Sequence, residues 1–429
     1  MYKHSVNLEI SKCMACTTCL KHCPTEAIRI REGHAVINPD RCIDCGECIR
    51  VCPYGAKYAE CDKLEDIKDY KWKIALPAPT LFGQFPKTDD VRLILEGLYK
   101  IGFDDVYEVS YAAEFISAYS KKLIKTEELK KPIISSACPA IVRLVSLKYP
   151  TLTDHLLPVM PPVELAAQLG RAQAKRKHPK FRYEDIAVCF ISPCPAKVSY
   201  VKNYTESFKS NIDFTLSISD VYFQLLGTIP KEAEKVKKLR SSKLGIDWAV
   251  TGGESMAIMH DKYLAADGID NSISILQEVE KGNMSDLDFI ELLACPGGCV
   301  GGVLTVENPY RAKARLQAIS SQVAFSGANA RKIDNYLQLD DLELSMSPTE
   351  VAVSGIGANF SESMRMMAEI QKLVKELPGI DCGVCGAPNC KAFAEDVVRG
   401  EIGCEACIVK GFRDLKEKLS GEKEGESLK

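Results

Sequence analysis

The chain has 429 residues, of which 46% are hydrophobic and 26% charged, and its formal net charge at pH 7 is −3. This length exceeds the roughly 250–300 residues at which one hydrophobic core stops growing, so we expect several domains. The charge balance argues against nucleic acid and against an anionic membrane surface as partners. The chain begins without a basic and apolar leader and lacks an apolar run of about 18 residues, so we expect a cytoplasmic protein with no transmembrane span. Nineteen cysteines in such a protein predict metal thiolates, because cytosolic thiols stay reduced.

One cysteine motif, Cys-x-x-Cys-x-x-Cys-x-x-x-Cys-Pro, occurs twice within residues 1–62. This spacing is typical of bacterial two-cluster ferredoxins, in which the fourth cysteine of each copy binds the other cluster. We therefore predict an α+β ferredoxin-like domain with two [4Fe-4S] clusters, and zinc knuckles are the alternative. The predicted ligands are Cys13, Cys16, Cys19 and Cys52 for one cluster, and Cys42, Cys45, Cys48 and Cys23 for the other.

From about residue 71, apolar runs alternate with amphipathic stretches. Helical spacing is present in segments such as 138–149 and 163–175. Strands are predicted at residues 72–76, 106–110, 132–136, 186–193, 214–218, 248–251 and 289–294. The alternation predicts an α/β domain with mostly parallel strands, in which the loops at the strand ends carry the chemistry.

Four further cysteines stand at the ends of these apolar runs. Cys138 and Cys194 each follow a predicted strand, and Cys295 and Cys299 enclose a Pro-Gly-Gly turn after the last one. Three strand-like segments can thus deliver four thiolates to one place, which predicts another cubane cluster. Zinc is disfavoured because its sites draw on closely spaced cysteine pairs, whereas Cys138 and Cys194 stand singly. Ordinary buried cysteines are the structural alternative.

The end of the chain contains a helical segment, a third cysteine group and a charged tail. Residues 362–377 have helical spacing and are expected to pack the module at 346–412 onto the rest of the chain. The cysteine pattern resembles the small [4Fe-4S] domain of electron-transfer complexes and corrinoid proteins. The implied ligands are Cys382, Cys385, Cys390 and Cys407, with Cys404 competing for the fourth place. Residues 413–429 are expected to form a charged, solvated tail.

The three central cysteine segments resemble the signature loops of the [FeFe]-hydrogenase large-subunit family. The matching residues are Ser136-Ala137-Cys138-Pro139, Ser192-Pro193-Cys194-Pro195-Ala196-Lys197, and Leu293 to Cys299. The resemblance spans roughly residues 70–320. It implies a catalytic domain, which we place at residues 70–345, with two lobes that are each a four-stranded sheet flanked by helices. The metal centre would lie between the lobes.

The resemblance also implies the cofactor, known as the H-cluster. Cys138, Cys194, Cys295 and Cys299 would hold its cubane, and Cys299 would also bridge to a two-iron subsite with carbon monoxide, cyanide and dithiolate ligands. Lys197 would hydrogen-bond a cyanide, a charge-assisted contact. With the three other [4Fe-4S] clusters, sixteen of the nineteen cysteines would be ligands, which leaves Cys61, Cys189 and Cys404 free.

The proton relay departs from the catalytic members of this family. They have a cysteine directly before the first cubane ligand, where this chain has Ala137. The methyl group of alanine can neither donate nor accept a proton. Other relay groups of the family are replaced by residues around Ser117 to Ser120 and by Leu157. Two methionines and a glutamate near the subsite are replaced by Ser192, Leu293 and Tyr200.

A complete ligand set with a broken relay resembles the sensory [FeFe]-hydrogenases (HydS). It predicts an enzyme that binds H2, oxidises it slowly and reversibly, and relays electrons or signal through its clusters to a redox or signalling protein partner. The chain could also form a homo-oligomer. Two alternatives stay open. One is a conventional electron-transferring hydrogenase with another proton path, and the other is a non-enzymatic iron–sulfur electron-transfer or scaffold protein without the two-iron subsite.

Overall fold

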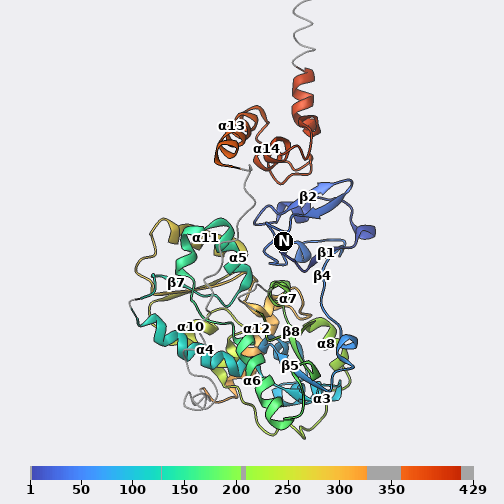
Figure 1. The fold of residues 1–429 in the computed structure, drawn as a ribbon, viewed down its shortest axis with the longest axis vertical. Coiled ribbons are helices and arrows are strands. Elements are labelled where there is room, and N and C mark those ends of the chain that lie inside the picture. Colours follow the sequence, from blue (N-terminus) through green and yellow to red (C-terminus); the bar gives the residue numbers. More distant parts are fainter. Residues whose placement is uncertain (1, 127, 204–208, 326–358, 417–429) are drawn as a thin grey trace, which may run out of the picture.

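The computed structural model describes residues 2–126, 128–203, 209–325 and 359–416. Three bodies follow one another along its longest axis (Figure 1). A large α/β domain lies at one end, the N-terminal domain in the middle, and the helices of the C-terminal module at the other end. The predicted boundary at 345/346 and the tail from residue 417 lie outside the described residues. Among the helices of the described part, we find none with the length and apolarity to cross a membrane.

The N-terminal domain is an α+β unit with two small antiparallel sheets. Strand β1 pairs with β4, and β2 pairs with β3. Leu20, Ile28 and Ala35 form its apolar core together with Cys19, so the cysteine loops wrap directly around this core. The elements are β1 (Val6–Leu8), α1 (Thr18–Lys21), β2 (Ile28–Arg31), β3 (His34–Ile37), α2 (Glu47–Arg50) and β4 (Lys57–Ala59).

The first lobe of the α/β domain is a parallel sheet with the strand order β6-β5-β8-β9. All seven residues of β8 (Ile186–Ser192) are buried, as expected of a parallel strand that is covered on both faces. Val188 and Phe190 join one apolar cluster, whereas Ala187, Cys189 and Ile191 join the other. Cys189 is therefore a core residue. The other strands are β5 (Trp72–Pro77), β6 (Asp105–Val106) and β9 (Phe214–Ser217).

Helices cover both faces of this sheet. Those that contribute to the first cluster include α4 (Val109–Ile124) and α6 (Pro162–Lys177), and those that contribute to the second include α3 (Val91–Lys100), α8 (Ile218–Leu225) and α12 (Pro309–Ser321). The short helices α9 (Lys243–Asp247) and α10 (Gly253–Ile258) pack against α4. This alternation of strand and helix is the α/β pattern that the sequence predicts.

The second lobe contains three parallel strands among the described residues, not the four that the family resemblance implies. Their order is β10 (Tyr263–Asp267), β11 (Phe289–Leu293) and β7 (Ile133–Ile134). Where a fourth strand would join β7, a single bridge links Ile134 to Leu156. The following segment has prolines at 158, 161 and 162, which lack the backbone N–H that a ladder needs. The helices beside this sheet include α5 (Pro139–Lys148) and α11 (Ile269–Glu280).

Two of the strand predictions need correction. Residues 248–251 form a turn between α9 and α10, because the next residues are Gly252, at a φ of +86°, and Gly253, where a Cβ would collide with the Asp247 carbonyl. The missed strand is β10, whose residues are partly exposed and give a weak apolar signal. At 106–110, only Val106 belongs to a strand, since helix α4 begins at Val109.

The C-terminal module has its own apolar core. Helix α13 (Phe360–Glu376) packs against α14 (Cys390–Val398), and residues 408–416 are helical. Ile370, Leu377 and Phe393 join this core, so among the described residues the predicted helix packs within the module and not onto the rest of the chain. The prediction that this helix packs the module onto the rest of the chain is wrong.

The α/β domain also contains the short helix α7 (Pro195–Lys202), which follows strand β8.

Candidate metal centre

The carboxyl ends of three parallel strands meet between the two lobes. Strand β8 of the first lobe ends at Ser192, and β7 and β11 of the second lobe end at Ile134 and Leu293. The loops that follow them contain the four central cysteines. Cys138 and Cys194 stand directly before α5 and α7, each of which begins with a proline. Proline suits this first helical position because its missing N–H has no partner there anyway.

The four central cysteines lie close enough to affect one another electrostatically. Burial raises the pKa of Cys295 well above its ordinary value, and the charges of Cys194, Cys138 and Cys299 raise it further. Gly302 packs against the carbonyl of Pro193, where a Cβ would collide, so the loops of Cys299 and Cys194 touch. Buried thiols of this kind are neutral without a bound metal ion, and iron binding stabilises their thiolates. Four such donors fit a cubane cluster.

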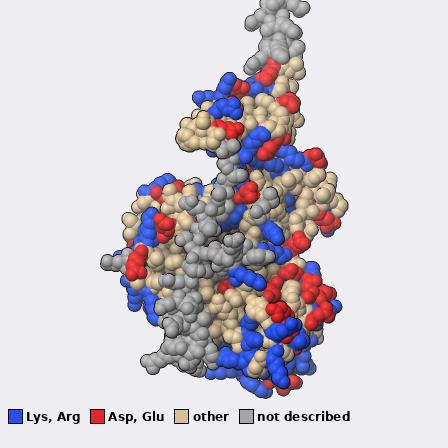
Figure 2. All heavy atoms as spheres, viewed as in Figure 1, with Lys and Arg blue, Asp and Glu red and all other residues tan. Residues whose placement is uncertain are grey.

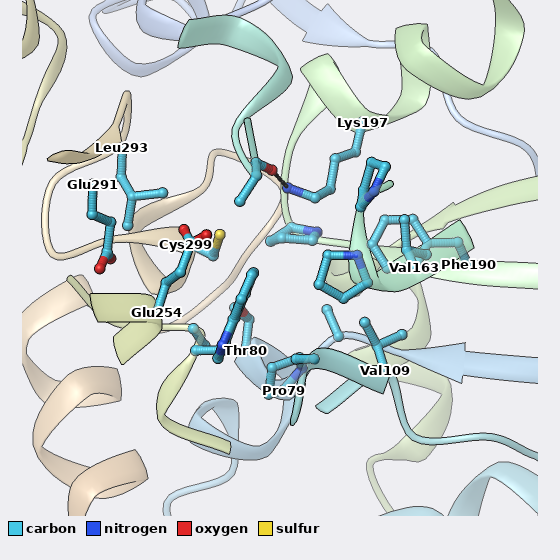
Figure 3. Close-up of a pocket in the computed structure, with 18 residues that line it drawn as sticks. Pro79, Thr80, Val109, Val163, Phe190, Lys197, Glu254, Glu291, Leu293 and Cys299 are labelled. Atoms are coloured by element: carbon cyan, nitrogen blue, oxygen red, sulfur yellow. Dashed lines mark hydrogen bonds between the residues drawn. The ribbon is translucent and has the colours of Figure 1, made fainter. Parts of the chain in front are cut away.

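A cavity of about 60 Å³ adjoins this group (Figure 3). Of the four cysteines, Cys299 lines it, together with Ala137, Lys197, Glu254 and Glu291 and a mainly apolar wall. One water molecule needs roughly 10–15 Å³ on this measure, so the cavity accommodates a group of several atoms. A small non-protein group attached through Cys299 therefore fits this space.

Lys197 lies at the wall of this cavity, with its ammonium pointing inward (Figure 3). Its Nζ donates a hydrogen bond to the carbonyl oxygen of Ala137 at 3.3 Å. Burial alone lowers the pKa of Lys197, but the charges of the surrounding cysteines, first among them Cys299, outweigh it and raise the pKa. Where a metal holds these cysteines as thiolates, the side chain is a cation with three N–H donors, of which one binds Ala137 among the described residues.

Glu254 and Glu291 are buried acids of the cavity wall that the sequence analysis did not identify. The Ser135 hydroxyl donates to Glu254 at 2.5 Å, and burial, followed by the charge of Glu291, raises the pKa of Glu254 to about 8. Glu291 accepts hydrogen bonds from the backbone of Gly252 and from Ser255, and burial raises its pKa. Glu291 could have been found in the sequence, because it stands within the apolar strand Phe289-Ile290-Glu291-Leu292-Leu293. Acidic residues are rarely fully buried, and those that are often belong to functional sites.

Helix α4 presents Val109 and Ala113 to the cavity, and neither side chain can carry a proton. Ser117 instead accepts from the indole of Trp248 at 2.8 Å and donates to the Ala113 carbonyl. Leu157 is part of the apolar core. Ser192 bonds to the backbone of Cys194, and Leu293 lines the cavity. Of the positions discussed for the relay, Ala137 and Leu293 therefore face the cavity with apolar side chains.

The cysteines of the N-terminal domain surround two smaller cavities. Each cavity is lined by three cysteines of one motif copy and the fourth cysteine of the other copy. The two sets are Cys13, Cys16, Cys19 and Cys52, and Cys42, Cys45, Cys48 and Cys23. Both donor sets fit [4Fe-4S] clusters.

The second of these cavities lies against the α/β domain. Arg143 of α5 donates to the Cys42 carbonyl at 2.6 Å, and Arg50 of α2 donates to the Gly301 carbonyl at 2.7 Å. Cys45 also packs against the apolar cluster that Cys138 and Cys194 contact. The N-terminal domain is thus joined to the central cysteine group through the loop of its second cysteine set.

The C-terminal module has a similar cavity, lined by Cys382, Cys385, Cys390 and Cys407. Cys407 is buried, whereas Cys404 is absent from the lining and lies 4.0 Å from the ammonium of Lys410. The geometry therefore favours Cys407 as the fourth donor. Cys61 lines none of these cysteine cavities among the described residues, and burial raises its pKa to about 12.

Three family models match different parts of this chain. The family model of the iron only hydrogenase large subunit, C-terminal domain, matches residues 71–263 and 231–303. A 4Fe-4S dicluster domain matches residues 12–56, and an Fe-S cluster family matches residues 377–409. The solved [FeFe]-hydrogenase HydA1 of Chlamydomonas reinhardtii aligns with a TM-score of 0.48 and 16% identity, over 67% of this chain and 95% of that one.

Three curated relatives each match about 70% of this chain. The periplasmic [Fe] hydrogenase large subunit of Nitratidesulfovibrio vulgaris is 26% identical over 70% of this chain and 86% of its own length. The NADP-reducing hydrogenase subunit HndD of Solidesulfovibrio fructosivorans is 24% identical over 69% of this chain and 56% of its own. The "Probable cytosolic Fe-S cluster assembly factor oxy-4" of Caenorhabditis elegans is 21% identical over 70% and 72%. Because the hydrogenase model covers more than half of its length, with the cysteine loops inside the match, this chain belongs to the iron-only hydrogenase large-subunit family.

Proposed function

We propose that this protein is a sensory [FeFe]-hydrogenase that oxidises H2 slowly and reversibly. The observation that carries the proposal is the cavity beside Cys299, in which the cation Lys197 is present but a methyl group, that of Ala137, stands where catalytic members have a thiol. The cofactor would be an H-cluster held by Cys138, Cys194, Cys295 and Cys299, together with three [4Fe-4S] clusters. When bound, its two-iron subsite would supply the heterolytic cleavage of H2 into a proton and a hydride, whose oxidation gives a second proton and two electrons.

Lys197 would orient this subsite, because an ammonium in a mainly apolar cavity forms strong charge-assisted hydrogen bonds to anionic ligands. Its bond to the Ala137 carbonyl fixes the direction of the side chain and leaves N–H donors for the cofactor. The hydrophobic wall formed by residues such as Val109, Val163 and Phe190 limits water around the site.

Glu254 would receive the proton in place of the missing thiol. It lines the same cavity, and its raised pKa of about 8 leaves roughly a tenth of the carboxyl groups ionised at pH 7. At neutral pH only this small fraction of protein molecules has a carboxylate that can accept a proton. A low fraction of competent molecules agrees with slow H2 oxidation. The oxidation rate should therefore rise as pH increases toward 8.

The electrons or the signal would pass through the clusters to a separate redox or signalling protein. Infrared spectroscopy of the matured protein, combined with an H2 oxidation assay, tests the proposal. We expect carbonyl and cyanide bands together with low turnover. Bands with the turnover of a dedicated hydrogenase would favour the conventional enzyme with another proton path. No bands after maturation would favour the non-enzymatic alternative, toward which the similarity to oxy-4 points.

A further inference from the structure

The C-terminal module docks on the N-terminal domain through one buried carboxylate. Asp396 of α14 is 4% exposed and accepts hydrogen bonds from two arginines of strand β2. Arg29 binds it with both ends of its guanidinium group, at 2.6 and 3.0 Å, and Arg31 binds it at 2.5 Å. Next to this group, Arg41 pairs with Glu395 at 2.9 Å. A bidentate, buried contact of this kind fixes both distance and orientation.

Backbone contacts continue the same interface. The N–H of Ile30 donates to the Gly386 carbonyl at 2.9 Å, and any side chain at Gly386 would collide with the Ile30 carbonyl. Asn389 donates to Glu26 at 2.8 Å, and Lys21 binds the carbonyl of Pro388 at 3.0 Å. Figure 2 shows basic and acidic atoms side by side where the two bodies meet. These contacts join residues more than 300 positions apart, so they define one specific docked arrangement.

The interface connects two of the cysteine cavities directly. Ile30 lines the cavity of Cys13, Cys16, Cys19 and Cys52, while Gly386 follows Cys385 of the C-terminal cavity. Leu20, next to Cys19, would lie 3.5 Å from a Cβ at Gly383, which itself lines the C-terminal cavity. Residues that line or flank the first N-terminal cysteine cavity thus contact residues that line or flank the C-terminal one.

We propose that this arginine–aspartate interface holds the C-terminal cluster as the electron-transfer neighbour of the first N-terminal cluster. The proposal rests on the cluster content proposed above. In each step, one electron leaves the reduced N-terminal cluster, which is oxidised, and enters the C-terminal cluster, which is reduced, with no bond or proton transferred. The electrons originate from H2, and a one-electron acceptor, either a redox protein or a soluble dye, removes them. Cys382 is exposed, which places this cavity within reach of such an acceptor.

Electron paramagnetic resonance of the full-length protein reduced with dithionite tests this relay, because two paramagnetic clusters at close distance broaden each other's signals. The two N-terminal clusters also interact with each other, so the diagnostic component is the one missing from Cys407→Ser, which lacks the C-terminal cluster. We expect this component in the parent protein. Asp396→Lys should abolish it while the iron content stays the same, since a third cation would replace the partner of Arg29 and Arg31. The matched control is Glu376→Gln, which removes a carboxylate that faces Lys410 inside the module and should leave the interaction unchanged.

Asp396→Lys loses about four irons per chain if the module unfolds. In that case the double variant Arg29→Glu, Arg31→Glu tests the same interface through the residues of the N-terminal domain. It should lose the same component of the magnetic interaction, with full iron content and a larger radius of gyration in X-ray scattering. A parent with complete iron but without this component, or a component that survives both sets of substitutions, would overturn the relay alone. A parent that lacks the iron of the C-terminal cluster would overturn the proposed cluster content as well.

Discussion

Replacing Glu254 by glutamine tests whether this buried acid is protonated at neutral pH. The substitution keeps the shape of the side chain and an oxygen that accepts from Ser135, but it removes the ionisable group. Glu254 is 3% exposed, and burial together with the charge of Glu291 raises its pKa from an ordinary value of 4.5 to about 8. The variant should therefore differ from the parent in the pH dependence of its stability.

The sign follows from proton binding in the two states. Below about pH 4.5 the acid is protonated whether the protein is folded or unfolded, and the raised pKa has no effect on stability. Between pH 4.5 and 8 the unfolded chain has lost the proton that the folded protein retains, so the parent loses stability as pH rises. At 1.36 kcal/mol for each tenfold change in proton affinity, the loss reaches roughly 5 kcal/mol above pH 8. The Glu254→Gln variant does not lose stability in this way, because glutamine does not ionise.

Thermal unfolding midpoints of the parent and of Glu254→Gln, measured from pH 5 to pH 9, supply the test. The variant should become progressively more stable relative to the parent up to pH 8, with a constant difference above it. Glu401→Gln, at an exposed position, is the control and should follow the parent at every pH. An infrared titration of the carboxyl band lost in Glu254→Gln gives an independent pKa. A stability difference that does not vary with pH, or a carboxyl that titrates near pH 4.5, would refute the reasoning.

Three further predictions concern the cysteine sites. Ala137→Cys should raise H2 turnover, but by less than the 10²- to 10⁴-fold typical of a well-placed acid or base, because α4 faces the cavity with apolar side chains. Parallel assays of the parent and the variant with one redox mediator check this prediction. A gain of the full range would contradict it. Lys197→Ala should retain the cubane iron yet lower the infrared signal of the two-iron subsite, since a charge-assisted contact contributes about 1.5–3 kcal/mol; unchanged cyanide bands would place the lysine elsewhere. Cys407→Ser should remove about four irons per chain, the content of one cubane, whereas Cys404→Ser should not, and the reverse result would exchange the two ligands.

Local spacing in the sequence was sufficient to predict the three-body organisation and the cysteine groups. The ferredoxin motif fixes its four cysteines within eleven residues of chain, so backbone geometry alone limits how they can gather. The long apolar runs of β5, β8 and β11 were recognised because a strand buried on both faces must be apolar throughout. Short or partly exposed elements such as β10 carry no such signal, and the turn at 248–251 was mistaken for a strand.

What the tertiary structure decided depends on contacts between residues far apart in the chain. The pKa of Glu254 is raised because folding buries it beside Glu291, and no local pattern records that pairing. The position of the C-terminal module is set by the ion pairs of Asp396 with Arg29 and Arg31. In the sequence, these three residues cannot be told from ordinary charged surface residues. Burial and partner identity are properties of the folded chain, because desolvation and Coulomb energies depend on distances in space that sequence separation does not determine.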